Sequence, residues 1–249
     1  MIEFCHVTAG YGGVPAVRDV SLHIPRGKIT AVIGPNGCGK TTLLRAAVRQ
    51  LPLSGGEILM DGRSVSDYGR KEFARAASFM PQVRTVPSIT VGGLVAHGRF
   101  PHLGLSRQLR QADRAAVERA MEETGVSAWA GRDLRELSGG ERQRVYLAMA
   151  LAQETEVIFL DEPTTYLDLG RQFEVLGLIQ TLNSRGKTIV MVLHDLAQAL
   201  GYSHQTVLLE QGRLVLCAGA ETLYESGEID RVFGVRACRA GETWYFTPR

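Results

Sequence analysis

The chain has 249 residues and a formal net charge of +2, with 45% apolar and 22% charged residues. The length suits one large domain, or a core with a subdomain, and the composition is that of a folded globular protein. A charge so close to neutral argues against a nucleic-acid-binding protein, which would show a concentrated basic excess.

The cysteines and the apolar runs limit the class of protein further. Cys5, Cys38, Cys217 and Cys238 are scattered without a Cys-x-x-Cys pair, which fits neither a disulfide framework nor a zinc site and suits a reducing compartment. Residues 1–6 lack a basic start before an apolar run, so we expect no signal peptide. No stretch approaches the roughly 20 apolar residues of a membrane helix, so membrane association would come through a partner.

The first third of the chain alternates between predicted strands and helices. Turn residues and apolar runs predict strands at 2–8, 17–24, 28–33, 55–60 and 78–80, and helices at 41–50 and 68–76. Gly10–Gly13 is expected as a turn, and Asp61-Gly62 closes the fourth strand.

The pattern changes after Gln82. Residues 88–153 lack apolar β-type runs, and apolar residues recur at helical spacing over 105–121, with a further helix at 139–153. Strands return at 157–160, 188–193 and 206–209, with a helix at 170–185, and the tail from 219 is expected to be helical and peripheral. We therefore predict a single α/β domain over 1–249. Its core, 1–87 and 154–249, is a mostly parallel sheet plus a small antiparallel part, and a helical subdomain at 88–153 is inserted into it.

A glycine-rich loop follows the third predicted strand. Gly34-Pro35-Asn36-Gly37-Cys38-Gly39-Lys40-Thr41 matches G-x-x-x-x-G-K-[ST] between a strand and a helix. Its backbone N–H groups would curl around phosphates, Lys40 would reach the terminal phosphates, and the Thr41 hydroxyl could ligate Mg²⁺. Cys38 occupies an unconstrained position, so we interpret it as a small filler rather than a redox control. The loop alone predicts nucleoside triphosphate binding.

Two apolar strands end in residues suited to phosphate chemistry. Asp161 and Glu162 follow residues 157–160, so Asp161 would hold Mg²⁺ and Glu162 could polarise an attacking water. His194 follows residues 188–193 in the same way and is a candidate sensor of the γ-phosphate. Gln82 lies where the alternating strand and helix pattern gives way to the helical segment, and its amide could bind Mg²⁺-bound water. Tyr11, taken alone, is interpreted as an ordinary aromatic residue in a turn.

A second anion site of a different kind is predicted at 137–145, Leu-Ser-Gly-Gly-Glu-Arg-Gln-Arg-Val. A hydroxyl and two glycines precede a helix, which would turn bare N–H groups and the positive end of the helix dipole outward. The chain therefore has two predicted phosphate sites of different kinds, at 34–41 and 137–145, and a single function should account for both.

Together these motifs resemble the nucleotide-binding subunits of ATP-binding cassette (ABC) transporters, over essentially the whole chain. The run at 137–145 is the most specific element, since many nucleotide hydrolases share the phosphate loop. The resemblance implies that ATP and Mg²⁺ are bound and that ATP is hydrolysed. Contacts with the nucleotide would come from Tyr11, which stacks on adenine, from Gly34–Thr41 and Thr42, and from Ser138, Gly139, Gly140, Glu141 and Asp168.

The resemblance also implies how the two sites work together. Ser138, Gly139 and Gly140 would grip the γ-phosphate of ATP held by a second copy in a head-to-tail homodimer, and Asp168 would act across that dimer. Gln82 would be the Q-loop residue and a metal-site residue with Thr41 and Asp161, while Glu162, His194, Lys40 and Gln82 would serve catalysis. Transmembrane permease subunits and, indirectly, an extracytoplasmic binding protein are the implied partners. Nucleic acid is not an implied partner. The implied location of the protein is peripheral, at the cytoplasmic face of the inner membrane.

Three further stretches resemble one subgroup, the importers of ferric siderophores, haem and cobalamin. These are Gly98–His102, Pro163–Asp168 and Val232–Gly234 with Val235. The alternative interpretation of residues 98–102 is that they are a helix end terminated by proline, which would say nothing about the cargo. His97 and His102 suit no metal site on such a segment. A ferric siderophore is the expected cargo, and haem and cobalamin remain alternatives.

Two other classes stay as competitors. A soluble ABC ATPase is disfavoured because the chain has one cassette and no sustained heptads. A kinase with only the phosphate loop is disfavoured by the run at 137–145. One departure is Gly92-Gly93, in a helix expected after Thr90 as N-cap, where each glycine costs about 1 kcal/mol relative to alanine. We interpret it as a more flexible contact with the permease.

Overall fold

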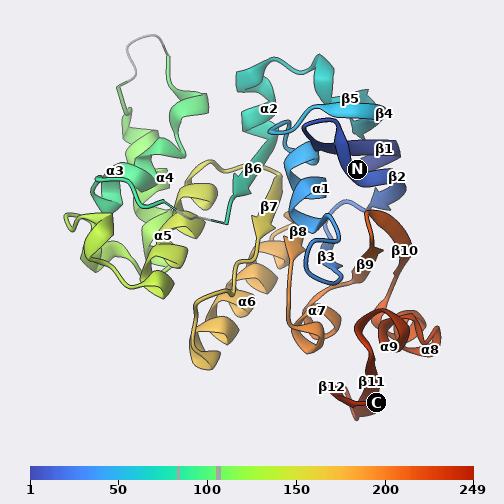
Figure 1. The fold of residues 1–249 in the computed structure, drawn as a ribbon. Coiled ribbons are helices and arrows are strands. Elements are labelled where there is room, and N and C mark those ends of the chain that lie inside the picture. The colour runs from blue at the N-terminus through green and yellow to red at the C-terminus, as the bar shows by residue number, and fades with distance from the viewer. Residues whose placement is uncertain (83–84, 105–107) are drawn as a thin grey trace. The chain divides into compact units, whose positions relative to one another are not determined.

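The structure is a computed structural model that describes residues 1–82, 85–104 and 108–249 (Figure 1). Its contacts divide the chain into two compact units. The first unit comprises Met1–Tyr68 and Thr188–Arg249, and the second comprises Gly69–Lys187.

An antiparallel sheet opens the first unit. It has the order β2 (Val14–Ile24), β1 (Ile2–Tyr11), β4 (Leu53–Met60) and β5 (Arg63–Ser64), and it confirms the expected antiparallel part. The short β5 was not predicted. Asp61 and Gly62, with φ values of 52° and 76°, form a two-residue turn of the kind that returns a strand on itself, so β4 and β5 are a hairpin.

Parallel strands form the core of the first unit. β3 (Ile29–Ile33) lies between β8 (Thr188–Val192) and β9 (Gln205–Glu210) and is parallel to both. β3 and β8 are buried along their whole length, and each has a mostly apolar sequence with a single threonine, Thr30 or Thr188. Helices α1 (Lys40–Ala47) and α7 (Leu196–Tyr202) belong to the same unit. Since β3 and β8 are parallel, the segments that begin at Gly34 and His194 leave the same edge of the sheet.

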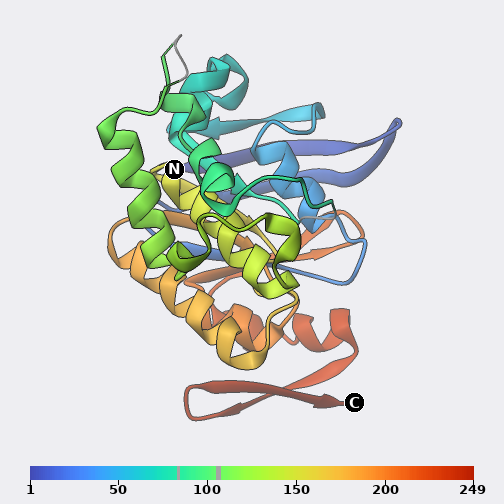
Figure 2. The same ribbon diagram turned by 90° about the vertical axis from the view of Figure 1, so that its left-hand side faces the viewer.

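The tail corrects one prediction. Helices α8 (Ala220–Glu225) and α9 (Glu228–Phe233) agree with the expected helical tail, but a hairpin of β11 (Val235–Ala240) and β12 (Thr243–Pro248) follows them (Figure 2). Gly234 ends α9 in a left-handed conformation, and Gly241 starts a two-residue turn with φ of 61°. β12 packs on α7 and buries Trp244. The antiparallel β10 (Arg213–Ala218) was also not predicted.

The second unit joins a strand pair to a group of helices. β6 (Ala77–Met80) directly follows α2 (Arg70–Ala76). It pairs in parallel with β7 (Val157–Asp161), which comes much later in the chain. Helices α3 (Val91–His97) and α4 (Gln111–Glu123) pack on α5 (Gly139–Ala152), and α6 (Leu169–Ser184) completes the group (Figures 1 and 2). The helix expected over 105–121 begins at Gln111, and Leu105 at its start lies outside the described residues. Short 3₁₀ turns lie at Val65–Asp67 in the first unit and at Phe100–His102, Ser127–Trp129 and Leu134–Glu136 in the second.

The two glycines of α3 have a packing role. Thr90 caps the helix as expected, because its hydroxyl accepts a hydrogen bond from the Gly93 N–H at 3.2 Å. The Gly92 N–H donates to the Ala130 carbonyl at 2.9 Å, and a Cβ added at Gly92 would lie 3.2 Å from that oxygen. Because Gly92 has no side chain, the backbone at Ala130 can approach α3 closely at this position.

Candidate functional site

The glycines of the phosphate loop are required by its backbone. Gly34–Thr41 connects β3 to α1, and Gly34, Gly37 and Gly39 all have positive φ. A Cβ at Gly34 would lie 2.2 Å from the Leu209 carbonyl oxygen, and a Cβ at Gly39 would lie 2.5 Å from the Ala16 carbonyl oxygen. No other residue fits at either position without displacing backbone.

Lys40 places a positive charge within this loop. Lys40 is 6% exposed, and its Nζ donates to the carbonyl oxygens of Gly34 at 2.7 Å and Pro35 at 3.1 Å. Both acceptors are neutral, so the ammonium keeps its charge for an anion. Thr41 and Thr42 lie in the first turn of α1, where the backbone N–H groups of a helix have no intrahelical acceptor. Loop and helix together offer the cation and the backbone N–H groups that a phosphate site requires, and phosphate binding here stays a prediction.

Cys38 is buried in the same loop. Burial raises the pKa of its thiol, and the nearby Lys40 charge offsets this only in part. A thiol held in its neutral form is a poor nucleophile, which agrees with the interpretation of Cys38 as a filler.

Tyr11 and His194, also in the first unit, are both accessible. Tyr11 ends β1, is 49% exposed and accepts a hydrogen bond from the Arg45 guanidinium at 3.3 Å. His194 is exposed two residues beyond the end of β8. Their roles toward a nucleotide stay predictions.

In the second unit, Gln82 and Glu162 come together. Gln82 Nε2 donates to Glu162 Oε2 at 2.7 Å, and the Thr165 hydroxyl donates to the same oxygen at 3.0 Å. Gln143 on α5 donates to the backbone carbonyl of Glu162 at 2.8 Å. Glu162 is 8% exposed, and Asp161, which ends β7, is fully buried. Thr165 and Gln143 were not predicted as site residues, although Thr165 lies in Pro163–Asp168 and Gln143 in the run at 137–145.

The run at 137–145 begins a helix as predicted. Ser138 caps α5: its hydroxyl accepts from the Glu141 N–H at 3.3 Å, and the Glu141 carboxylate accepts from the Ser138 N–H at 2.7 Å. Hydrogen bonding from Ser138, first from its backbone N–H, lowers the pKa of the Glu141 carboxyl. Glu141 therefore satisfies the cap, and the positive end of the helix dipole remains at Gly139 and Gly140.

A pocket of about 320 Å³ opens at this helix start, within the usual size range for a small ligand. A Cβ at Gly140 would lie 2.9 Å from Leu167 Cδ2, so a larger residue would crowd the pocket. Asp168 also lines it and caps α6 by accepting from the Arg171 N–H at 3.0 Å. Two further lining residues were not predicted: Tyr166, which is 74% exposed, and Arg144, which lies 4.8 Å from the ring centre of Trp129.

The stretch Gly98–His102 has a structural role. Arg99 is 5% exposed and donates to Asp113 at 3.0 Å, to Glu154 at 2.7 Å and to the Ala152 carbonyl at 2.7 Å. Nε2 of His102 lies 2.9 Å from the Gln153 carbonyl oxygen. In the part of the chain that the structure describes, no group of three or more His, Cys, Asp or Glu residues could hold a metal ion.

Among the residues that the structure describes, none of the helices has the length and apolar character of a membrane span.

Comparisons with known proteins identify the family. The family model described as "ABC transporter" matches residues 17–165. The iron(3+)-hydroxamate import ATP-binding protein FhuC of Bacillus subtilis is 43% identical over 92% of this chain and 86% of its own length. The ferric enterobactin transport ATP-binding protein FepC of Escherichia coli is 42% identical over the same shares. Among solved structures, the dimeric bacterial ABC transporter cassette MJ0796 has a TM-score of 0.79 at 27% identity, covering 88% of this chain and 99% of that one.

Proposed function

This chain belongs to the ABC transporter family, and on that basis we propose that it is the ATP-hydrolysing subunit of an importer for a ferric siderophore. The family supplies the α/β phosphate-loop fold, nucleotide binding and ATPase activity. Support for the cargo comes from FhuC and FepC, whose names give two different iron complexes. Haem and cobalamin importers remain the alternatives within the family.

The chain's own residues divide the reaction between them. Lys40 and the N–H groups of Gly34–Thr41 hold the β- and γ-phosphates, and Tyr11 stacks on adenine. Glu162 orients and polarises the attacking water, and His194 contacts the γ-phosphate. The observation that carries this assignment is the pair of donors, Gln82 and Thr165, that fix one oxygen of the Glu162 carboxylate.

Mg²⁺ fits the donor set of these residues. The Thr41 hydroxyl, the Gln82 amide oxygen and the Asp161 carboxylate are hard oxygen ligands, which Mg²⁺ prefers. The Gln82 amide nitrogen donates to Glu162, so its oxygen is the atom left to act toward a metal or metal-bound water. When bound, Mg²⁺ would neutralise charge that develops on the phosphates.

The two anion sites are explained by a dimer. In a head-to-tail pair, the phosphate loop of one copy and Ser138–Gly140 of the other would hold one ATP between them. A helix start that opens a pocket supports this assignment, because its N–H groups and dipole stabilise an anion. The dimeric cassette MJ0796 supports it as well. Hydrolysis removes the shared anion and should loosen the pair.

Permease subunits would dock this dimer peripherally at the cytoplasmic face of the membrane, and an extracytoplasmic binding protein would deliver the cargo. The test is reconstitution of the chain with its cognate permease in lipid vesicles. We expect ATPase stimulation by binding protein loaded with ferric siderophore. Equal or stronger stimulation by binding protein loaded with haem or cobalamin would contradict the assignment of a ferric siderophore as cargo. If no loaded binding protein stimulates the ATPase, the assignment as an importer subunit would be wrong.

A further inference from the structure

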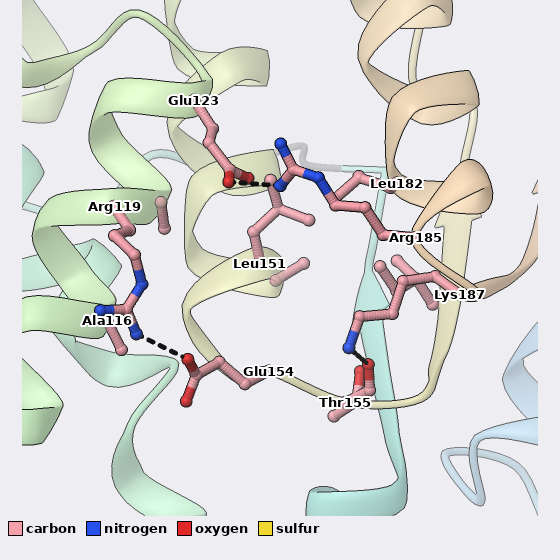
Figure 3. Close-up of a pocket in the computed structure, with 12 residues that line it drawn as sticks. Ala116, Arg119, Glu123, Leu151, Glu154, Thr155, Leu182, Arg185 and Lys187 are labelled. Atoms are coloured by element: carbon pink, nitrogen blue, oxygen red, sulfur yellow. Dashed lines mark hydrogen bonds and ion pairs between the residues drawn. The ribbon is translucent and has the colours of Figure 1, made fainter.

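A pocket of about 300 Å³ lies within the second unit, away from its predicted catalytic residues (Figure 3). Its lining comes from α4, α5, β7, the end of α6 and the segments that flank them. Thr155 lies before the first residue of β7, whereas Asp161 ends that strand. Ile158 is the lining residue nearest to Asp161 along β7, and at ~3.3 Å per residue the two Cα atoms are about 10 Å apart. The volume is near the lower end for ligand pockets, roughly 300–1,000 Å³.

Ion pairs stand on two sides of this α4–α6 pocket. Arg119 on α4 contacts Glu154 at 2.9 Å, and Arg185 after α6 contacts Glu123 at 2.6 Å (Figure 3). The other carboxylate oxygen of Glu154 accepts from the buried Arg99 at 2.7 Å. One carboxylate thus serves two guanidinium groups; Arg99 has a second carboxylate partner, Asp113 at 3.0 Å, whereas Arg119 shares the charge of Glu154 alone.

Lys187 forms a third side and differs from the two arginines. Its Nζ donates to the Thr155 carbonyl at 2.6 Å (Figure 3). That acceptor is neutral, and no carboxylate among residues 1–82, 85–104 and 108–249 pairs with this ammonium. An ammonium has three donors, so Lys187 can bind a ligand without giving up its contact with Thr155.

The charges of this network leave one positive charge in excess. Arg99, Arg119, Arg185 and Lys187 face three carboxylates, those of Glu123, Glu154 and Asp113. A single excess charge matches a carboxylate ligand better than a phosphate monoester, which carries about −1.5 to −2 at pH 7. The floor is apolar and made from small or aliphatic side chains: Ala116, Ala120, Ala150, Leu151, Ile158 and Leu182.

We propose that the α4–α6 pocket binds a small aliphatic carboxylate, with the carboxylate on Lys187 between Arg119 and Arg185 and the hydrocarbon on the alanine and leucine floor. Apolar surface on ligand and floor would leave water together, which adds to the charge interaction. An occupant would contact α4, α5 and the connection from α6. Because such a ligand binds only the folded protein, it should raise the melting temperature in a concentration-dependent way.

Hexanoate is a suitable probe for the full-length chain. We expect saturable chemical-shift changes at the methyl groups of Leu151, Ile158 and Leu182, and a rise in melting temperature. Acetate keeps the charge without the hydrocarbon, and hexylamine keeps the hydrocarbon with the opposite charge. Both should bind at least tenfold more weakly than hexanoate.

Lys187→Met should weaken hexanoate binding tenfold or more, since it removes the charge and keeps the aliphatic stem. Lys71→Met is the matched control, because Lys71 lies in the same unit and its Nζ also donates to a backbone carbonyl, that of Leu103, at 3.1 Å. This control should bind hexanoate as the parent chain does. Should Lys187→Met fail to fold, Ala116→Leu, which fills the floor and keeps the rim charges, should abolish binding.

Several results would overturn the proposal. These are no saturable binding of hexanoate, equal binding of hexylamine, equal loss in Lys71→Met and Lys187→Met, or hexanoate binding that survives Ala116→Leu. Inorganic phosphate that displaces hexanoate and binds more tightly would overturn the carboxylate in favour of a phosphate ligand. None of these results depends on ATP hydrolysis.

Discussion

Glu162 adopts a left-handed backbone conformation, with φ of 57°, directly after a buried strand. This region is unfavourable for a residue with a Cβ and persists where the surroundings over-determine it. Here Gln143 fixes the backbone carbonyl, and Gln82 with Thr165 fixes the carboxylate. The strain sets the direction of one side chain, which is what a residue that positions a water requires.

Glu162→Gln keeps the shape of this side chain and removes its ability to accept a proton. We expect ATP binding to be retained and the hydrolysis rate to fall by about 10²–10⁴, the range for a general base. Steady-state ATPase assays with nucleotide-binding titrations measure both quantities. Turnover near that of the parent chain would contradict the assignment of Glu162.

Arg99→Met should lower the free energy of unfolding by about 3–5 kcal/mol, because it leaves Asp113 buried without its cation. Burial alone would raise the pKa of Asp113, but hydrogen bonds from the Arg110 N–H and from Arg99, with the charge of Arg99, hold it below its usual range. A carboxylate with a lowered pKa stabilises the fold above its unfolded pKa, about 3.9, and loses that contribution as the pH falls.

The deficit of Arg99→Met should therefore shrink as the pH falls from 7 toward 3, since protonation of Asp113 removes the charge that lacks its partner. Urea unfolding at several pH values measures this. A deficit that is small at pH 7, or constant with pH, would show that the ion pair does not support the fold.

At the level of single residues, sequence reasoning identified chemistry and missed neighbours. Asp161-Glu162 could be recognised because two carboxylates end an apolar strand. Thr165 and Gln143 could not, because which donor reaches Glu162 depends on how the chain turns after β7 and on the packing of α5. Arg99 was placed in a stretch associated with cargo, yet its contacts are those of a buried structural cation.

At the scale of elements, α3 and α5 approach each other closely where α3 ends. A Cβ added at Gly98 would lie 2.2 Å from the Met149 carbonyl oxygen on α5. Backbone meets backbone at this position, so no rotamer change relieves the clash.

Gly98→Ala should therefore destabilise the protein by about 1–3 kcal/mol, the cost of overpacking. Gly177→Ala is the matched control, because Gly177 lies within α6 and a Cβ there meets nothing within 4 Å. That change should stabilise by about 0.4–1 kcal/mol, through helix propensity and reduced freedom of the unfolded chain. Chemical denaturation of both variants measures the two signs, and stabilisation by Gly98→Ala would contradict the packing.

The predicted elements also show where periodicity succeeds. Buried parallel strands such as β3 and β8 are mostly apolar in sequence and were predicted, as was the cap of α5. The hairpin β11–β12 was missed, although its two-residue turn at Gly241 is a hairpin signal. Short strands at the edge of a fold bury few residues, here Ala237 and Trp244, so their apolar pattern is weak.

For the whole molecule, the order of motifs predicted the fold and the family because each motif requires a set element on either side. The cargo could not be predicted with equal force. In the stretch at 98–102 that suggested the cargo, Arg99 and His102 make contacts inside the second unit. We propose that the catalytic arrangement depends on a second copy, because Ser138–Gly140 open a pocket at a helix start and the phosphate loop is a second predicted anion site.

The most direct test of that arrangement mixes two inactive variants. Ser138→Arg blocks the helix start and leaves the phosphate loop intact, whereas Lys40→Ala disables the phosphate loop and leaves the helix start intact. In a head-to-tail dimer of the two, the loop of the first and the helix start of the second complete one site. We predict that the mixture hydrolyses ATP several-fold faster than the sum of the separate variants. A mixture that does no better than that sum would contradict a site shared between two copies.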